Sequence, residues 1–373
     1  MHIFVIFGTR PEAIKLAPII QKARLEKEIR CTVCSTGQHL DLVSSIIEFF
    51  NIEVDIQLNL MSKNQSLSSF SSVCLIELDQ ILKKWRPNLV LVQGDTSTAF
   101  IGALSAFNNK IPCGHVEAGL RSFNKFSPFP EEMNRSLISK LALIHFAPTK
   151  SAYNNLLDEG INEKYIFEVG NTVVDTCLMV KEQMECSRTT IYTLLPRLDQ
   201  EKEIVLITCH RRENHGLPLR RICESINHLA EKYFSELQFV FPVHPNPNVS
   251  ESVNQYIDKK FKNILLTKPL AYPDLIFLLS QTRITLTDSG GIQEEAPTFN
   301  VPILILRENT ERMEGVAQGS ATLVGSNKQA IIEQFDRLYE AKNLSQLKNP
   351  YGQGDAADKI IAEILQLELP LPE

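Results

Sequence analysis

Three acidic side chains stand where strands end or helices begin in the first half of this sequence. Asp95 lies in QGDTST, Glu117 ends the apolar run PCGHVE, and Glu131 follows Pro130. Each has a structural explanation, because helix caps favour Asp and helix amino termini favour acids. A cluster of like charges can also hold one member protonated, which supplies an acid and a base near neutral pH. We therefore expect acid–base chemistry here.

Small residues in the second half could bind a diphosphate. TDSGGIQEEAP brings Ser289, Gly290 and Gly291 to a strand-to-helix junction, where backbone amides and the helix dipole favour an anion. Capping of this helix by Asp288 and Ser289 is the alternative. We favour phosphate binding, because paired glycines at a helix start otherwise cost stability.

Acidic and basic side chains surround these loops. Glu294 or Glu295, one turn into the helix, could accept both hydroxyls of a ribose. Arg10 in GTRPEA suits anion binding, although an ordinary strand–helix turn explains this loop equally well. His210 and Arg211 in TCHRRENHG suit a pyrophosphate, with an exposed charge run as the alternative. His244, in PVHPNPN, is more typical of a structural hydrogen-bonding residue than of a catalyst.

Several classes of protein and site are disfavoured. No GxGxxG fingerprint follows a predicted strand, so we expect no NAD or FAD, and no histidine pair has metal-ligand spacing. The net charge of -6 disfavours a nucleic-acid partner, and no apolar run approaches the ~20 residues of a membrane span. Eight scattered cysteines, including the Cys31–Cys34 pair inside a predicted strand, and an amino terminus unlike a signal peptide indicate a cytoplasmic protein.

Strands alternate with helices along the whole chain, which predicts an α/β fold built from parallel βαβ units. Ligands bind such sheets at the carboxyl ends of the strands, where nearly all the motifs above lie. The expected strands cover 3–7, 31–36, 89–93, 112–117, 165–170, 203–208, 237–243, 263–267, 283–288 and 301–306. The expected helices cover 12–25, 65–84, 96–107, 131–142, 217–233, 327–341 and 355–367.

The 373 residues exceed one ordinary core, so we expect two doubly wound, Rossmann-like domains with a cleft between them. The first domain, residues 1–170, carries the acids, and the second, residues 171–354, carries the phosphate loops. Residues 355–373 are expected to form a helix that packs back on the first domain.

The motifs, in this order, closely resemble those of the non-hydrolysing UDP-N-acetylglucosamine 2-epimerases. The matching strings are GTRPEAIKLAP, GQH, QGDTST, HVEAGLRS, PFPEEMNR, HRREN, VHPNP, DSGGIQEEAP and RENTERMEGVAQG. The resemblance implies a GT-B fold with its two domains facing a central cleft. It also implies a homodimer that interconverts UDP-GlcNAc and UDP-ManNAc for surface polysaccharides, without a cofactor.

In the family, UDP is eliminated to give 2-acetamidoglucal and is then added back while C2 is reprotonated on its other face. The motif match assigns catalytic roles to Asp95, Glu117, Glu131 and His210. It assigns substrate binding to Arg10, Lys15, Arg135, Arg211, His244, Ser289, Gly290, Gly291, Glu295 and Arg312. Some relatives bind UDP-GlcNAc as an activator, at a site that corresponds to Gln38, Glu131, Arg211 and His244.

Four other functions are compatible with the motifs. They are a hydrolysing epimerase that releases free ManNAc and UDP, an epimerase of a modified UDP-amino sugar, a GT-B glycosyltransferase and a catalytically silent nucleotide-sugar sensor. The GTRPEAIK string favours the non-hydrolysing branch. A glycosyltransferase or a sensor has no evident use for three acids.

Overall fold

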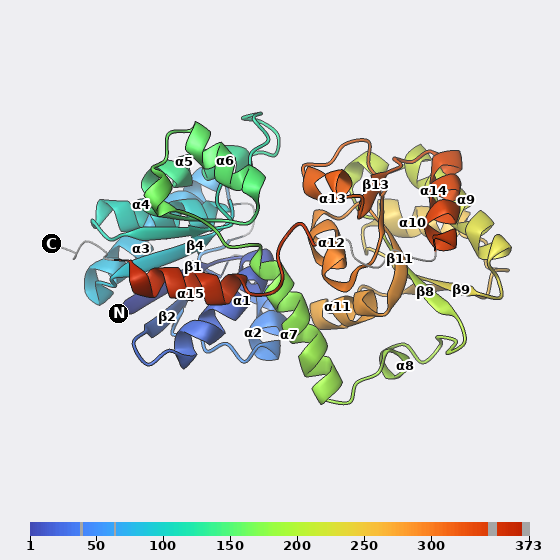
Figure 1. The fold of residues 1–373 in the computed structure, drawn as a ribbon, viewed down its shortest axis with the longest axis horizontal. Helices are drawn as coiled ribbons and strands as arrows, with labels where there is room; N and C mark the ends of the chain where they lie inside the picture. Colours follow the sequence, from blue (N-terminus) through green and yellow to red (C-terminus); the bar gives the residue numbers. More distant parts are fainter. Residues whose placement is uncertain (38–39, 63–64, 342–348, 368–373) are drawn as a thin grey trace. The chain divides into compact units, whose positions relative to one another are not determined.

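The computed structural model describes residues 1–37, 40–62, 65–341 and 349–367, and the chain divides into two compact units. Unit 1 comprises Met1–Thr176 and Tyr351–Glu373, and unit 2 comprises Cys177–Pro350. Each unit contains a sheet flanked by helices (Figure 1). The sequence places the two divisions after residues 170 and 354, a few residues from these positions.

Unit 1 is built on a seven-stranded sheet in the order β3-β2-β1-β4-β5-β6-β7, with every neighbouring pair parallel. Helices on both faces bury such strands, which explains near-continuous apolar runs such as IFVIF. The strands are β1 (His2–Phe7), β2 (Arg30–Ser35), β3 (Ile56–Gln57), β4 (Leu89–Gln93), β5 (Cys113–Val116), β6 (Ile144–Ala147) and β7 (Ile166–Glu168).

The helices of unit 1 pack in two groups: α3, α4 and α5 contact in series, and α1 contacts both α2 and α15. Their bounds are α1 (Arg10–Leu25), α2 (Leu40–Phe49), α3 (Leu67–Trp85), α4 (Ser97–Asn108), α5 (Glu131–Leu141), α6 (Lys150–Asp158) and α15 (Ala356–Gln366), with a 3-10 turn η1 (Glu163–Tyr165). Helix α7 (Thr172–Cys186) begins in unit 1 and ends in unit 2.

The last described helix, α15, lies against α1, as the red and blue ribbons of Figure 1 show. Its apolar face buries Ile360, Ile361 and Ile364. Asp175 accepts hydrogen bonds from the amides of Ala356 (3.3 Å) and Ala357 (2.9 Å), which satisfies two amides at the helix start.

Unit 2 repeats the architecture with a six-stranded parallel sheet in the order β10-β9-β8-β11-β12-β13. Its core includes the fully buried rings of Phe239, Phe241 and Phe335. The strands are β8 (Glu203–Thr208), β9 (Leu237–Pro242), β10 (Ile264–Thr267), β11 (Thr282–Thr287), β12 (Ile303–Ile305) and β13 (Ala321–Leu323).

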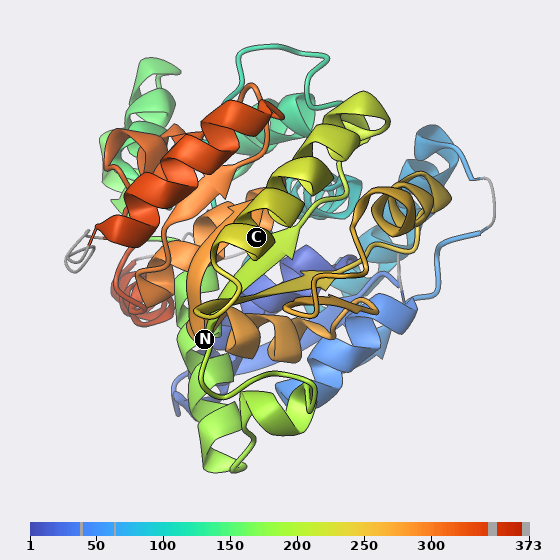
Figure 2. The ribbon, with the colours of Figure 1, turned by 90° about the vertical axis from the view of Figure 1, so that its right-hand side faces the viewer.

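The helices of unit 2 include an adjacent pair, α9 and α14, which Figure 2 shows side by side in yellow-green and orange-red. The helices are α8 (Ile191–Leu194), α9 (Leu217–Lys232), α10 (Pro247–Tyr256), α11 (Tyr272–Ser280), α12 (Gly290–Glu295), α13 (Met313–Ala317) and α14 (Lys328–Glu340). Two 3-10 turns, η2 (Arg212–Asn214) and η3 (Ala296–Phe299), complete the unit.

The predicted α/β class with two doubly wound parallel sheets is confirmed, and each expected strand and helix is present with small shifts at its ends. Three strands were not predicted: β3, β6 and β13, of two to four residues. Such short segments are too brief to show a period of two.

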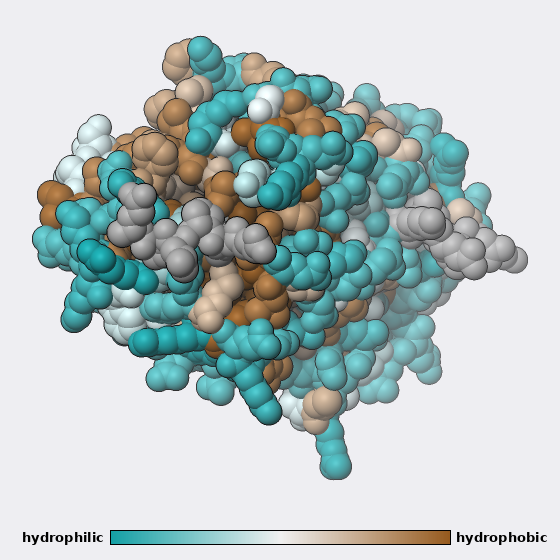
Figure 3. Space-filling view, turned by 60° about the vertical axis from the view of Figure 1, so that its left-hand side comes forward, coloured by the Kyte–Doolittle hydropathy of each residue, from teal (hydrophilic) through white to brown (hydrophobic). Residues whose placement is uncertain are grey.

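Hydrophobic residues gather in separate groups among hydrophilic ones on the face seen in Figure 3. Within the described residues, no helix is long and apolar enough to cross a membrane.

Candidate functional site

The loop after β1 packs tightly against its neighbours. A Cβ atom on Gly8 would lie 2.3 Å from Thr36 Oγ1 and 2.4 Å from Thr98 Oγ1, so only glycine fits between these hydroxyls. Glu12, in the first turn of α1, is fully buried and accepts hydrogen bonds from the amides of Gly8 (3.1 Å) and Thr9 (2.8 Å). The sequence motif GTRPE therefore has a structural role in addition to any ligand contact.

Glu12 also reaches the next loop along the sheet. Its carboxylate accepts a hydrogen bond from the Thr96 hydroxyl at 2.7 Å. Desolvation by burial raises the pKa of Glu12 to about 7, and the hydrogen bonds from Thr96 and the loop counteract only part of that effect. One carboxylate thus joins the starts of α1 and α4.

Glu117 is held by two donors immediately after β5. Lys15 Nζ lies 2.5 Å and Gln93 Nε2 lies 2.7 Å from Glu117 Oε2. The backbone of Glu117 adopts a left-handed φ of 65°, which is uncommon for a residue with a side chain and occurs often at functional sites. The structure therefore brings Lys15 and Glu117 together, as two of the predicted site residues.

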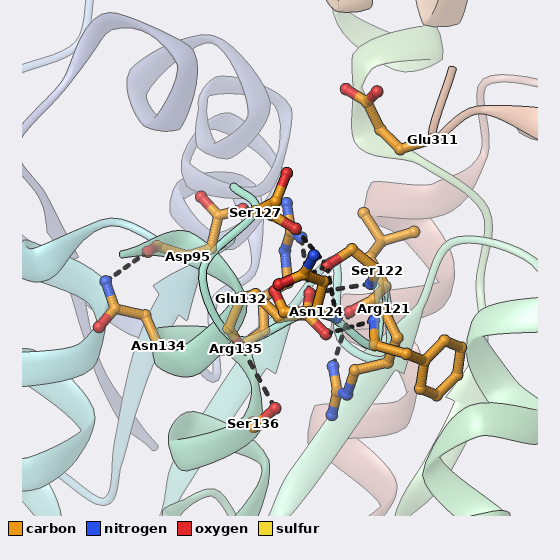
Figure 4. Close-up of polar contacts among 12 residues, drawn as sticks. Asp95, Arg121, Ser122, Asn124, Ser127, Glu132, Asn134, Arg135, Ser136 and Glu311 are labelled. Atoms are coloured by element: carbon orange, nitrogen blue, oxygen red, sulfur yellow. Dashed lines mark hydrogen bonds and ion pairs between the residues drawn. The ribbon is translucent and has the colours of Figure 1, made fainter. Parts of the chain in front are cut away.

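Asp95 does not cap the following helix. The N-cap of α4 is Thr96, whose side chain accepts a hydrogen bond from the amide of Ala99. The Asp95 carboxylate instead pairs with Arg135 Nη2 at 2.6 Å, and its backbone carbonyl accepts a hydrogen bond from Asn134 Nδ2 (Figure 4). The capping interpretation of Asp95 is therefore wrong.

Arg135 is shared between two carboxylates. Its Nη1 lies 3.1 Å from Glu132 Oε2, and Glu132 also accepts hydrogen bonds from the amides of Ser122 and Phe123, both at 2.9 Å (Figure 4). Burial lowers the pKa of Arg135, but the charges of Asp95 and Glu132 outweigh it and hold the pKa above its ordinary value. The predicted substrate-binding residue Arg135 thus holds Asp95 in this structure.

Glu131 differs from its neighbour. It is the first residue of α5 and is half-buried, whereas Glu132 is buried. Arg135 lies four residues further along the helix, so Glu131 shares a helix face with the partner of Asp95. Lys15 and Arg135 place a cation beside Glu117 and beside Asp95, so the structure surrounds these acids with opposite charges as well as like ones.

Two histidines, in the strands β5 and β6, are buried. His115 Nε2 lies 2.7 Å from the carbonyl oxygen of Gly94, and desolvation lowers the pKa of His115 to about 4. Desolvation likewise lowers the pKa of His145 to about 3. Both are neutral near pH 7.

Arg10, at the first position of α1, is exposed and can meet a ligand.

In unit 2, the buried carboxylate of Asp288 organises the loop that follows β8. It accepts hydrogen bonds from the amides of His210 (2.9 Å) and Arg211 (2.9 Å) and from Asn214 Nδ2 (2.9 Å). Ser289 is the N-cap of α12, but its side chain makes no capping bond. Capping by Asp288 and Ser289 is therefore not what these residues do.

His210 lies beside this carboxylate and against a second histidine. The rings of His210 and His244 stack with centroids 5.7 Å apart, and His244 Nδ1 accepts a hydrogen bond from the amide of Asn246. Desolvation lowers the pKa of His210, Asp288 raises it, and Arg211 and His244 lower it; the net direction is downward. The structure thus brings His210, Arg211 and His244 together.

Gly290 is explained by Arg312. A Cβ atom on Gly290 would lie 2.9 Å from the guanidinium carbon of Arg312, so glycine lets this cation lie over the start of α12. Arg312 is held by Glu294, whose Oε1 is 2.8 Å from its Nε, and by Glu311. A cation and the small residues Ser289, Gly290 and Gly291 therefore occupy one strand-to-helix junction.

Glu295 is buried in the same helix. Burial and the neighbouring charge of Glu295 hold the pKa of the buried Tyr272 hydroxyl well above its ordinary value. The sequence offers Glu294 and Glu295 equally as ribose acceptors. The structure gives them different neighbours: Glu294 pairs with Arg312, and Glu295 lies beside the Tyr272 hydroxyl.

Four residues that organise the site were not predicted to belong to it: Glu12, Gln93, Glu132 and Asp288. Each is a polar residue within or directly beside an apolar strand or at a helix start, and this signal alone could have flagged them. Gln38, which the resemblance places in an activator site, lies outside the described residues.

Comparisons with known proteins cover nearly the whole chain. A family model described as UDP-N-acetylglucosamine 2-epimerase matches residues 21–365. The UDP-N-acetylglucosamine 2-epimerase of Neisseria meningitidis serogroup A is 43% identical over 371 residues, covering 98% of this chain and 99% of that protein. The enzyme of the same name from Escherichia coli K12 is 41% identical over 97% of each chain.

Solved structures agree with these matches. The crystal structure of UDP-GlcNAc 2-epimerase from Neisseria meningitidis bound to UDP-GlcNAc aligns with a TM-score of 0.89 at 42% identity, covering 98% of this chain and 100% of that one. The alignment spans both units and confirms the GT-B-like α/β fold class that the sequence predicts.

Proposed function

Because this chain belongs to the UDP-N-acetylglucosamine 2-epimerase family, we propose that it interconverts UDP-GlcNAc and UDP-ManNAc without releasing the sugar from UDP. The observation that carries the proposal is the arrangement after β4 and β5, where Asp95 and Glu117 are each held by a buried or half-buried cation. Such acids are positioned for proton transfer rather than used as helix caps.

The chemistry proceeds by elimination and addition. A base removes the C2 proton while the C1–O bond to UDP breaks, which leaves a C1=C2 double bond in 2-acetamidoglucal. UDP then adds back at C1, and C2 receives a proton on its opposite face. Asp95, Glu117 and Glu131 are the groups that we propose move these protons.

The departing diphosphate needs cations and donors, because negative charge develops on it as the C1–O bond breaks. We propose that His210, Arg211, His244, Ser289, Gly290, Gly291 and Arg312 of unit 2 and Arg10 and Lys15 of unit 1 supply them. Glu295, to which the motif match assigns substrate binding, is the proposed ribose acceptor.

The test is incubation with UDP-GlcNAc in deuterated water. We expect UDP-ManNAc that carries deuterium at C2 with UDP attached. Free ManNAc in stoichiometric amount with UDP would establish hydrolysis instead, and no exchange at all would refute epimerisation of this substrate. Asp95→Asn, Glu117→Gln and Glu131→Gln should each abolish exchange, while calorimetry should show UDP binding largely retained.

We further propose that the protein acts in the cytoplasm as a homodimer that supplies surface-polysaccharide precursors, and that UDP-GlcNAc also activates it. Support comes from the motif resemblance. Sedimentation of the purified protein tests the dimer. The dependence of the initial rate of UDP-ManNAc conversion on added UDP-GlcNAc tests activation.

A further inference from the structure

Asp288 is a fully buried carboxylate that directly follows β11. An isolated buried charge is costly, so its stability depends on the donors around it. Besides the amides of His210 and Arg211 and the side chain of Asn214, the thiol of Cys209 donates a hydrogen bond to it at 3.2 Å.

All of these donors come from one segment, Cys209–Asn214, which leaves the neighbouring strand β8. β8 and β11 pair in parallel up to Thr208 and Thr287, so their following residues meet at the same end of the sheet. Asn214 Nδ2 also donates to the carbonyl of Leu306, after β12. The segment is thus held at the ends of the adjacent strands β11 and β12, chiefly by the side chain of Asp288.

The carboxylate also faces the imidazole of His210, with Asp288 Oδ1 3.4 Å from His210 Nδ1. Because Nδ1 faces Asp288, Nε2 points away from this carboxylate. The stacked ring of His244 limits how the imidazole can rotate. Asp288 and His244 therefore leave Nε2 as the nitrogen that is available to a ligand.

We propose that Asp288 is a positioning residue for the epimerisation: it fixes the Cys209–Asn214 segment and orients His210 so that Nε2 meets the diphosphate of the substrate. This inference rests on the proposed function. A carboxylate beside Nδ1 favours the protonated ring, which takes up its proton from solvent before the C1–O bond breaks. In that imidazolium, Nε2–H donates a hydrogen bond to the departing diphosphate as its negative charge develops; the proton stays on His210, and no covalent bond to the protein is formed.

Asp288→Asn tests the proposal, because it keeps the shape of the side chain but removes the charge and places an amide donor among existing donors. Asp288 is the group that raises the pKa of His210 against burial, Arg211 and His244. In the variant, the imidazole should therefore titrate at a lower pH, as followed by NMR of histidine-labelled protein. The kcat for UDP-ManNAc formation should fall about tenfold or more.

Asp175→Asn is the matched control, since Asp175 is another buried aspartate that accepts two backbone amides, in unit 1. It should leave the His210 titration unchanged. The positioning role is refuted if Asp288→Asn leaves both the titration and kcat unchanged, or if Asp175→Asn alters the titration equally.

Two readouts are independent of turnover. Hydrogen exchange on the unmodified protein should show the amides of His210 and Arg211 protected, although they lie in a loop, and rapid exchange there would overturn the proposal even if the variant does not fold. An unmodified enzyme that shows no turnover but has these protected amides, and whose His210 titration shifts in Asp288→Asn, would refute the proposed function alone.

Discussion

At the scale of single residues, two adjacent glutamates have different environments. Glu131 is half-buried at the start of α5. The carboxylate of Glu132 accepts hydrogen bonds from two backbone amides and from Nη1 of Arg135. The other end of that guanidinium holds Asp95. Glu132 thus links the segment after β5 to a proposed catalytic acid, although both glutamates are equally favoured at a helix amino terminus.

Glu132→Gln should lower the kcat for C2 exchange by about tenfold to a hundredfold, because Arg135 and Asp95 lose their fixed position. The KM for UDP-GlcNAc should change much less. Deuterium incorporation at C2 over a range of substrate concentrations separates the two quantities.

Glu159→Gln is the matched comparison. Glu159 pairs with the buried Arg121 at 2.6 and 2.8 Å in the same unit. Through the Ser139 hydroxyl this pair reaches the backbone carbonyl of Arg135, but none of its described contacts is with the Arg135 guanidinium that holds Asp95. Turnover should fall much less than in Glu132→Gln. Equal losses in the two variants would mean that Glu132 only stabilises the fold.

At the scale of secondary-structure elements, Glu12 joins the start of α1 to the N-cap residue of α4. A turn and a cap that are separate in the sequence become one hydrogen-bonded group. The cost is a buried carboxyl whose pKa is raised to about 7, mainly by desolvation.

The sign of the resulting pH dependence follows from linkage. The ordinary pKa of a glutamate side chain is 4.5, and burial raises the pKa of Glu12 to about 7, so the folded protein holds the proton more tightly than the unfolded chain. The stability contribution of this group is present below pH 4.5 and is lost as the pH rises to about 7. At 1.36 kcal/mol per pKa unit, the loss is about 3 kcal/mol.

Glu12→Gln cannot ionise, so the free energy of unfolding of the unmodified protein should fall relative to this variant between pH 4.5 and 7. The only tryptophan in the chain, Trp85, lies in unit 1, so its fluorescence in urea titrations reports on this unit. A difference between the two proteins that stays constant over this pH range would contradict the raised pKa.

At the scale of the whole molecule, unit 1 is completed by chain from both ends of the sequence. α15 packs on α1, and Asp175 accepts hydrogen bonds from the first two amides of α15. The stability of unit 1 therefore depends on residues that follow the whole of unit 2.

Ile360→Ala should lower the free energy of unfolding of unit 1 by about 2–5 kcal/mol, because it leaves a cavity where a fully buried side chain packs. Leu365→Ala removes a 37% exposed side chain from the same helix and should cost much less. Trp85 fluorescence in urea again provides the measurement. Equal effects would show that α15 does not pack on unit 1 in solution.

The sequence by itself determined the α/β class, most strands and helices and the family. Parallel strands that are buried on both faces need long apolar runs. These runs and the family motifs both consist of consecutive residues, so they can be recognised in the sequence without the structure. It also placed His210 and Glu117 after the ends of strands, where ligands bind in such sheets.

Only the tertiary structure decided which polar side chains are partners. Lys15 meets Glu117, Arg135 meets Asp95, and Asp288 meets His210 across separations of roughly 40 to 100 residues along the chain. A cap, a dipole contact and an ion pair use the same residue types in a sequence. The choice among them depends on which strand ends lie next to each other, and the pairing of strands in the sheets sets that order.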